Sequence, residues 1–287
     1  MPVKNRFAEL LPEITEWRRD FHAHPEILFD THRTSGIVAD KLREFGCDEV
    51  VEGIGKTGVV GIIKGKTNGS GRTIGLRADM DALPIHEATG LEYASKTDGA
   101  MHACGHDGHT AMLLGAAKYL AETRNFDGTV VLIFQPAEEG GAGAKAMIDD
   151  GLIERFGIDE VYGMHNAPGV PVGTIVTRPG PLQASTDEFE ITVTGLGGHA
   201  AEPHRAVDTT LVASQIVVTL HSIVSRNVNP LNSVVLTVGT FNTDSKASNI
   251  IAHTAKMQGT VRCLNPDDRA LMEGRIRRVV EDTASAF

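Results

Sequence analysis

Short apolar runs bounded by glycines alternate with amphipathic segments along the first 165 residues. The runs lie at 59–63, 73–77, 129–134 and 160–164. Because the first three are almost continuously apolar, we expect them to be strands buried in a sheet, and we expect the fourth to be a strand that ends at His165. Apolar residues at helical spacing predict helices on both sides of Pro25 within 7–45, at 109–122 and at 145–153. Strands alternating with helices indicate an α/β domain that binds ligands at the carboxyl ends of its strands.

The pattern changes near residue 186. From there the predicted order is strand, helix, strand, strand, helix, at 188–194, 207–224, 233–241, 255–261 and 266–283. This order is that of a ferredoxin-like unit without its last strand. We therefore predict two domains, 1–185 and 186–287, and expect the second to be incomplete within this sequence.

Composition narrows the class of protein. The 287 residues are 41% hydrophobic, which is enough to bury a core. The formal charge is −10 and there is no dense basic block, which argues against nucleic-acid binding. No apolar stretch reaches the length of a membrane span, and the N-terminus lacks the apolar core of a signal peptide. With only three scattered cysteines, we expect a cytoplasmic protein with reduced thiols.

The stretch Met101–Thr110 contains three histidines, a cysteine and an aspartate just ahead of a predicted helix. Thiol and imidazole groups on a short turn are suited to a divalent transition metal, and Cys104 and His106 can point to one position. We expect the helix N-terminus to stabilise a Cys104 thiolate. The alternative is a small buried cysteine beside histidines on the helix surface.

Glu138 and Glu139 follow the apolar run 129–134. Because adjacent residues at a strand end point in opposite directions, we expect their side chains to diverge. One carboxylate could then bind a metal while the other accepts a proton from an activated water. The alternative is a pair of solvated glutamates in a glycine-rich loop.

Three further positions are candidates. Asp79 and Asp81 are two residues apart and would share a strand face, where they could orient a ligand, or they could form a turn with Pro84. His165 ends a predicted strand and could be a ligand or a simple polar cap. His199 lies in a glycine-rich turn of the second predicted domain and would by itself be read as a loop histidine.

Six motifs occur in a characteristic order: Arg18–Glu26, Arg77–Pro84, Met101–His109, Gln135–Glu139, Gly163–His165 and Gly198–Ala201. Together they resemble the M20 peptidase/amidohydrolase family, in particular the branch of hippurate hydrolases, N-acyl-amino-acid amidohydrolases and auxin-conjugate hydrolases. The similarity runs over essentially the whole chain. It implies two divalent metal ions, zinc or manganese, in a mixed-sheet α/β domain with helices on both faces. It also implies an inserted ferredoxin-like lid that forms a homodimer.

The resemblance also implies roles for individual residues. The metal ligands would be Cys104, His106, Glu139 and His165. The catalytic residues would be Glu138 as general base, Asp81 as the aspartate that orients the site, and His199 reaching the partner subunit's site. Asn249 and Arg262 would hold the substrate carboxylate, for which the arginine fork is well suited.

The implied reaction is metal-dependent hydrolysis of the amide bond of a small N-acyl amino acid, giving a carboxylic acid and a free amino acid. Two alternatives stay open. One is a thiol hydrolase with Cys104 as nucleophile and a nearby histidine as base. The other is a truncated homologue that dimerises or binds metal without turnover, because the family's last ligand histidine has no candidate after residue 264.

Overall fold

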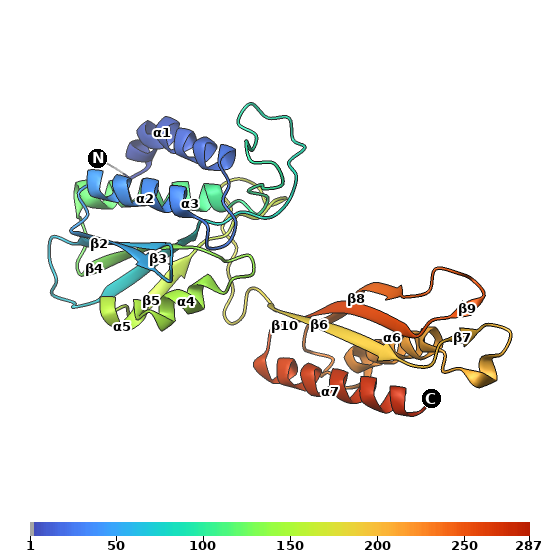
Figure 1. Cartoon of the computed structure of the whole chain (residues 1–287). Coiled ribbons are helices and arrows are strands. Elements are labelled where there is room, and N and C mark those ends of the chain that lie inside the picture. The colour runs from blue at the N-terminus through green and yellow to red at the C-terminus, as the bar shows by residue number, and fades with distance from the viewer. Residues whose placement is uncertain (1–2) are drawn as a thin grey trace. The chain divides into compact units, whose positions relative to one another are not determined.

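A computed structural model of the chain describes residues 3–287 (Figure 1). They form two compact units, one ending at Val170 and one from Pro171 to Phe287. The division lies earlier than the predicted boundary at 185/186. Residues 171–184 form no helix or strand. The change of pattern in the sequence therefore coincides with the first strand of the second unit, which begins at Ser185, and not with the start of that unit. None of the helices within residues 3–287 is both long and apolar enough to cross a membrane.

The first unit is a five-stranded mixed sheet with helices on both faces, as predicted (Figure 1). Its helices are α1 (Val3–Ala23), α2 (His32–Glu44), α3 (His106–Thr123), α4 (Gly143–Asp149) and α5 (Leu152–Phe156). Its strands are β1 (Glu49–Ile54), β2 (Gly58–Lys64), β3 (Thr73–Asp79), β4 (Thr129–Gln135) and β5 (Glu160–Gly163). The strand order is β1-β2-β4-β3-β5. Strand β3 runs parallel to β4 and β5, whereas β2 is antiparallel to β1 and β4.

The packing on both faces of strand β4 shows why this strand is almost entirely apolar. Leu132 and Phe134 pack under α1, α2 and α3, whereas Val131 and Ile133 face the cluster formed with α4 and α5. Each of these four side chains is at most 2% exposed. Burying a side chain of this size stabilises the fold by roughly 1.5–3 kcal/mol.

Two elements differ from the sequence prediction. The hairpin strand β1 was not predicted, because it is an edge strand with Glu49 and Glu52 among its exposed residues and has no continuous apolar run. The single helix expected at 145–153 is two helices. Gly151 between them has a left-handed backbone (φ 87°), which ends the first helix and starts the second.

The second unit has the five predicted elements in the predicted order. They are β6 (Ser185–Thr194), α6 (Thr209–Arg226), β8 (Val234–Thr243), β10 (Thr254–Cys263) and α7 (Pro266–Ser285). The sheet order is β6-β10-β8, with antiparallel neighbours. Asp208 and Asn265 begin α6 and α7 by accepting backbone N–H groups of the first turn. A short pair, β7 (Gly198–His199) and β9 (Ile250–Ile251), and the 3-10 turn Pro203–Arg205 are additional.

Candidate metal centre

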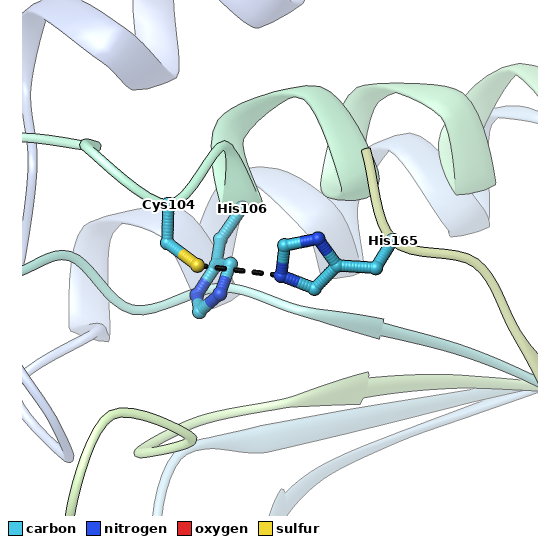
Figure 2. Close-up of side chains that lie close together, drawn as sticks. All are labelled: Cys104, His106 and His165. Carbon is cyan, nitrogen blue, oxygen red and sulfur yellow. Dashed lines mark hydrogen bonds between the residues drawn. The ribbon is translucent and has the colours of Figure 1, made fainter. Parts of the chain in front are cut away.

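The candidate residues of the first unit lie at one edge of its sheet. Parallel pairing sets Asp79 beside Gln135 and Arg77 beside Gly163, so that β3, β4 and β5 end close together. The segments that leave these ends carry the predicted aspartates, glutamates and His165. The N-terminus of α3 supplies His106 at the same place (Figure 2). Ligands at the carboxyl ends of parallel strands are the arrangement expected of an α/β sheet.

Cys104, His106 and His165 form the first group of candidate ligands. One ligand atom from each lies within 4.8 Å of the other two. The Cys104 Sγ is 3.3 Å from His165 Nε2, the contact drawn as a dashed line in Figure 2. The His165 Nδ1 lies 2.7 Å from the carbonyl oxygen of Asn166. Since a carbonyl can only accept, Nδ1 carries the proton, and the Nε2 lone pair faces the cysteine.

His106 has a free nitrogen in a buried position. Its ring is fully buried, and Nδ1 donates to the carbonyl oxygen of Asp81 at 2.8 Å. The other nitrogen, Nε2, has no hydrogen-bond partner. A buried polar atom without a partner is costly, unless something else binds it. The free lone pair of His106 therefore fits a metal ligand.

Glu138 and Glu139 converge on this same nitrogen. Their carboxylate oxygens lie 3.9 Å and 3.7 Å from His106 Nε2. The expectation that the two side chains diverge is wrong, because β4 already ends at Gln135 and Ala137 adopts a left-handed backbone (φ 51°). The glutamates thus lie in a turn, where strand alternation does not apply. Their environments still differ, since the Glu138 side chain is 42% exposed and that of Glu139 is 17% exposed.

Asp81 holds this turn in place. Its carboxylate oxygens accept the backbone N–H groups of Glu138 at 2.9 Å and Glu139 at 3.1 Å. Its carbonyl oxygen fixes the His106 ring, as described above. Asp81 therefore orients a candidate ligand, as one of the two interpretations expected, and it also holds the distant turn that carries both glutamates.

A second group, Asp79, His106 and His109, was not predicted as a set. Its candidate ligand atoms also lie within 4.8 Å of one another, and all three residues are buried. The Asp79 Oδ1 is 2.6 Å from His109 Nδ1, and Oδ2 is 2.7 Å from an Arg77 nitrogen. The sequence signals for His109 are its place in the histidine-rich stretch 101–110 and its position three residues after His106 on the same helix. Burial raises the pKa of Asp79, but the His109 hydrogen bond and the Arg77 charge outweigh it and lower that pKa to about 2.

The electrostatics of Cys104 contradict one expectation. Burial, followed by the nearby charge of Glu139, raises the pKa of the Cys104 thiol to about 12. The predicted stabilisation of a thiolate by the helix N-terminus is therefore wrong for the protein groups alone, because burial and the carboxylates of Glu139, Glu138 and Asp79 oppose it. Burial also raises the pKa of Glu139. For His106, burial favours the neutral ring, but the hydrogen bond to Asp81 and the charge of Asp79 dominate and raise its pKa.

The candidate substrate residues of the second unit are divided between its two ends. His199 pairs with Ile250 in the β7–β9 ladder, and the Asn249 carbonyl accepts the Ala200 N–H group at 3.0 Å. This ladder lies at the Thr254 end of β10, whereas Arg262 lies near the other end and donates to the Val261 carbonyl at 3.1 Å. At about 3.3 Å per residue, the two ends are roughly 26 Å apart. Within one chain, Arg262 therefore does not meet His199 or Asn249.

A mixed sheet with thiol, imidazole and carboxylate groups gathered at its carboxyl edge is the architecture of a metal-dependent hydrolase. The chain belongs to the peptidase family M20/M25/M40, whose sequence pattern matches residues 75–273. It is 50% identical to the hippurate hydrolase of Campylobacter jejuni, over 96% of this chain and 73% of that protein. It is 46% identical to the N-acetyl-L-cysteine deacetylase of Bacillus subtilis, over 94% of this chain and 64% of that protein.

Solved structures agree with this assignment. The chain superimposes with a TM-score of 0.80 on the YXEP protein of Bacillus subtilis, described as a dinuclear metal-binding peptidase of the M20 family. The two are 38% identical, over 98% of this chain and 72% of the other. A structure from methicillin-resistant Staphylococcus aureus gives a TM-score of 0.89 at 36% identity, over 99% of this chain and 76% of the other. The expected family and fold class are confirmed.

Proposed function

We propose that the chain hydrolyses the amide bond of N-acyl amino acids, releasing a carboxylic acid and a free amino acid. The observation that carries the proposal is the free Nε2 of buried His106, surrounded by the thiol of Cys104, the ring of His165 and two carboxylates. The names of the relatives supply the substrate class, since a hippurate hydrolase and an N-acetylcysteine deacetylase both act on N-acyl amino acids.

In this proposal the metal ligands are Cys104, His106, Glu139 and His165. The donor set fits a divalent transition ion, because it combines sulfur, two imidazoles and a carboxylate. The buried Oε1 of Glu139 has no hydrogen-bond partner, as expected of an atom that binds a cation. The thiol favours zinc, and manganese is the alternative. We take the number of two ions from the family resemblance and from the dinuclear YXEP protein.

A bound divalent ion supplies Lewis acidity toward the amide carbonyl and lowers the pKa of water. Glu138 is the more exposed of the two glutamates and is the proposed general base. Its carboxylate can accept a proton from the attacking water and pass it to the leaving nitrogen. Asp81 keeps Glu138 and Glu139 in place through their backbone N–H groups.

For the substrate we propose that Arg262 binds the carboxylate of the amino acid, as a bidentate fork can. Because His199 and Asn249 lie at the opposite end of the second unit, we propose that they serve the site of a second copy in a homodimer formed through this unit. His199 would there stabilise the oxyanion of the reacting carbonyl. The cytoplasmic location stays a prediction.

Among the alternatives, the thiol hydrolase is disfavoured by the high pKa of Cys104. A thiol with a pKa of about 12 is protonated at neutral pH and is a weak nucleophile. It also gives no role to the paired glutamates. The homologue without turnover predicts metal binding but no product, and the experiment below separates it from the enzyme.

The test is amino-acid release from a panel of N-benzoyl and N-acetyl amino acids with zinc or manganese added. Glu138→Gln should reduce the rate by roughly 10²- to 10⁴-fold, the usual contribution of a general base, with metal binding retained. Glu139→Gln should weaken metal binding itself. Glu154→Gln, at an exposed position of α5, is the control and should match the wild type. No release by folded, metal-loaded protein would reject the proposed activity, and release that a chelator leaves unchanged would reject its metal dependence.

A further inference from the structure

Asn166 lies directly after His165 and contacts the site with three of its groups. Its backbone nitrogen lies 3.1 Å from His109 Nε2. Its side-chain Oδ1 is 2.6 Å from the same nitrogen. Its carbonyl oxygen accepts the Nδ1–H group of His165 at 2.7 Å. The third contact fixes which nitrogen of His165 is free to bind, as second-layer partners of metal ligands commonly do.

The partner of Asn166 is itself held firmly. His109 is 3% exposed, and its Nδ1 is 2.6 Å from Asp79 Oδ1 at the end of β3. The His109 ring also packs edge-on against His165, with ring centroids 4.7 Å apart and an interplanar angle of 69°. The segment that bears His165 is therefore attached to both β3 and α3 through a single buried histidine.

On its other side Asn166 packs against Gly105. This glycine has a left-handed backbone (φ 93°), and an added Cβ would lie 2.5 Å from Asn166 Oδ1 and 2.9 Å from both Cγ and Nδ2. The amide plane thus rests on the backbone between Cys104 and His106, with no space for a methyl group. Asn166 consequently contacts the two chain segments that supply three of the proposed ligands.

We propose that Asn166 is a positioning residue that sets the distance between the Cys104–His106 segment and His165. The inference rests on the proposed function, because it takes these three residues as metal ligands. Its physical basis is that Asn166 has contacts on two sides. His109 holds Asn166 on one side, and on the other side the absence of a side chain at Gly105 lets the Asn166 amide lie close to the backbone. Truncation of the side chain should let the two segments move apart while their own side chains stay intact.

The experiment is a titration with Co²⁺ alone, with absorption reporting the thiolate-to-cobalt band and calorimetry the affinity. Asn166→Ala should weaken Co²⁺ binding by roughly 10- to 100-fold and reduce or shift the thiolate band. Truncation removes the contact of Oδ1 with buried His109, so the control is that Asn166→Ala keeps a native circular-dichroism spectrum and unfolds cooperatively. Gly105→Ala should have a similar effect on affinity.

The double variant Asn166→Ala/Gly105→Ala distinguishes contact from general strain. Because truncation at 166 removes the three atoms nearest to the new methyl group, the loss of affinity in the double variant should be clearly smaller than the sum of the two single losses. Two glycine controls separate the other effects. Gly108→Ala has open space in the first turn of α3, and Gly99→Ala (φ 76°) tests a left-handed backbone with nothing within 4 Å.

The outcomes are distinct for this inference and for the function on which it rests. Wild-type affinity and an unchanged band in Asn166→Ala would overturn the positioning role alone, as would fully additive losses in the double variant. Absence of Co²⁺ binding or of a thiolate band in the wild-type protein would overturn the proposed metal centre, and the positioning role with it.

Discussion

Asp81→Asn offers the sharpest test of how the glutamate turn is held. The Asp81 side chain is 1% exposed, and its two oxygens each accept one peptide N–H group, from Glu138 and Glu139. Asparagine has the same shape, but one oxygen becomes an NH₂ group. One of the two N–H groups would then face another donor and lose its partner.

The magnitude follows from these contacts. A hydrogen bond to a charged acceptor contributes about 1.5–3 kcal/mol, and a buried donor left without a partner costs about 1–3 kcal/mol. Allowing for relaxation of the turn, we expect a local destabilisation of about 2–4 kcal/mol. At 1.4 kcal/mol per factor of ten, the opening equilibrium of the turn would rise roughly 30- to 700-fold.

The assay is native-state hydrogen exchange of the Glu138 and Glu139 amides, residue by residue. Both should exchange faster in Asp81→Asn, whereas amides in the middle of β4 should change little. Asp149→Asn is the control, because Asp149 is 61% exposed and pairs only with Lys145 on α4. Unchanged exchange at both glutamate amides would refute the reasoning.

Three further predictions concern stability and the site. The hydrogen bond to Asp107 raises the pKa of buried His22 above its ordinary value of 6.5. The contribution of His22 to the free energy of unfolding is therefore complete below pH 6.5 and is lost as the pH rises through the raised pKa. Urea unfolding across this range should show a loss of stability that His22→Asn lacks, and parallel curves would contradict it. Leu114→Ala, at a fully buried core position, should cost about 2–5 kcal/mol by urea unfolding, and a loss below about 1 kcal/mol would be inconsistent with this packing. In Gly143→Ala the new Cβ would lie 1.7 Å from the carbonyl oxygen of Pro136, so the glutamate turn must move. Hydrolysis should fall while circular dichroism stays native, and full activity would show that the turn tolerates the displacement.

The sequence predicted the strands of the first unit except β1, whose apolar residues are interrupted by Glu52 and Gly53. The run 129–134 is apolar because α3 packs on one side of β4 and α4 on the other. The edge strand β1 has no such constraint, and Glu49, Glu52 and Gly53 leave only a short apolar stretch in it. Burial on two faces makes a strand such as β4 easy to recognise, since it removes the polar positions that otherwise interrupt an apolar run. The other edge strand, β5, was predicted although three of its four residues are exposed.

Residue types at the candidate site could be predicted, but their directions could not. The convergence of Glu138 and Glu139 depends on the left-handed backbone of Ala137, for which alanine gives no signal. The contact of His109 with Asn166 joins residues 57 positions apart, and it follows from sheet pairing rather than from local pattern. The sequence motifs therefore predicted which residue types form the candidate site, whereas the tertiary fold determined which of their atoms come into contact.

The parallel arrangement of β3, β4 and β5 has a practical consequence for handling the protein. Because these strands are parallel, their amino ends lie together at the edge of the sheet opposite to the candidate site. The exposed turn at 66–71 leads into β3 at that edge. Strand β3 has seven residues and ends at Asp79, so its two ends are roughly 20 Å apart at about 3.3 Å per residue. A fluorophore or surface tether attached at Asn68 would thus be held on the side of the first unit away from its carboxyl edge. Immobilised protein labelled there should leave that edge free for ligands from solution.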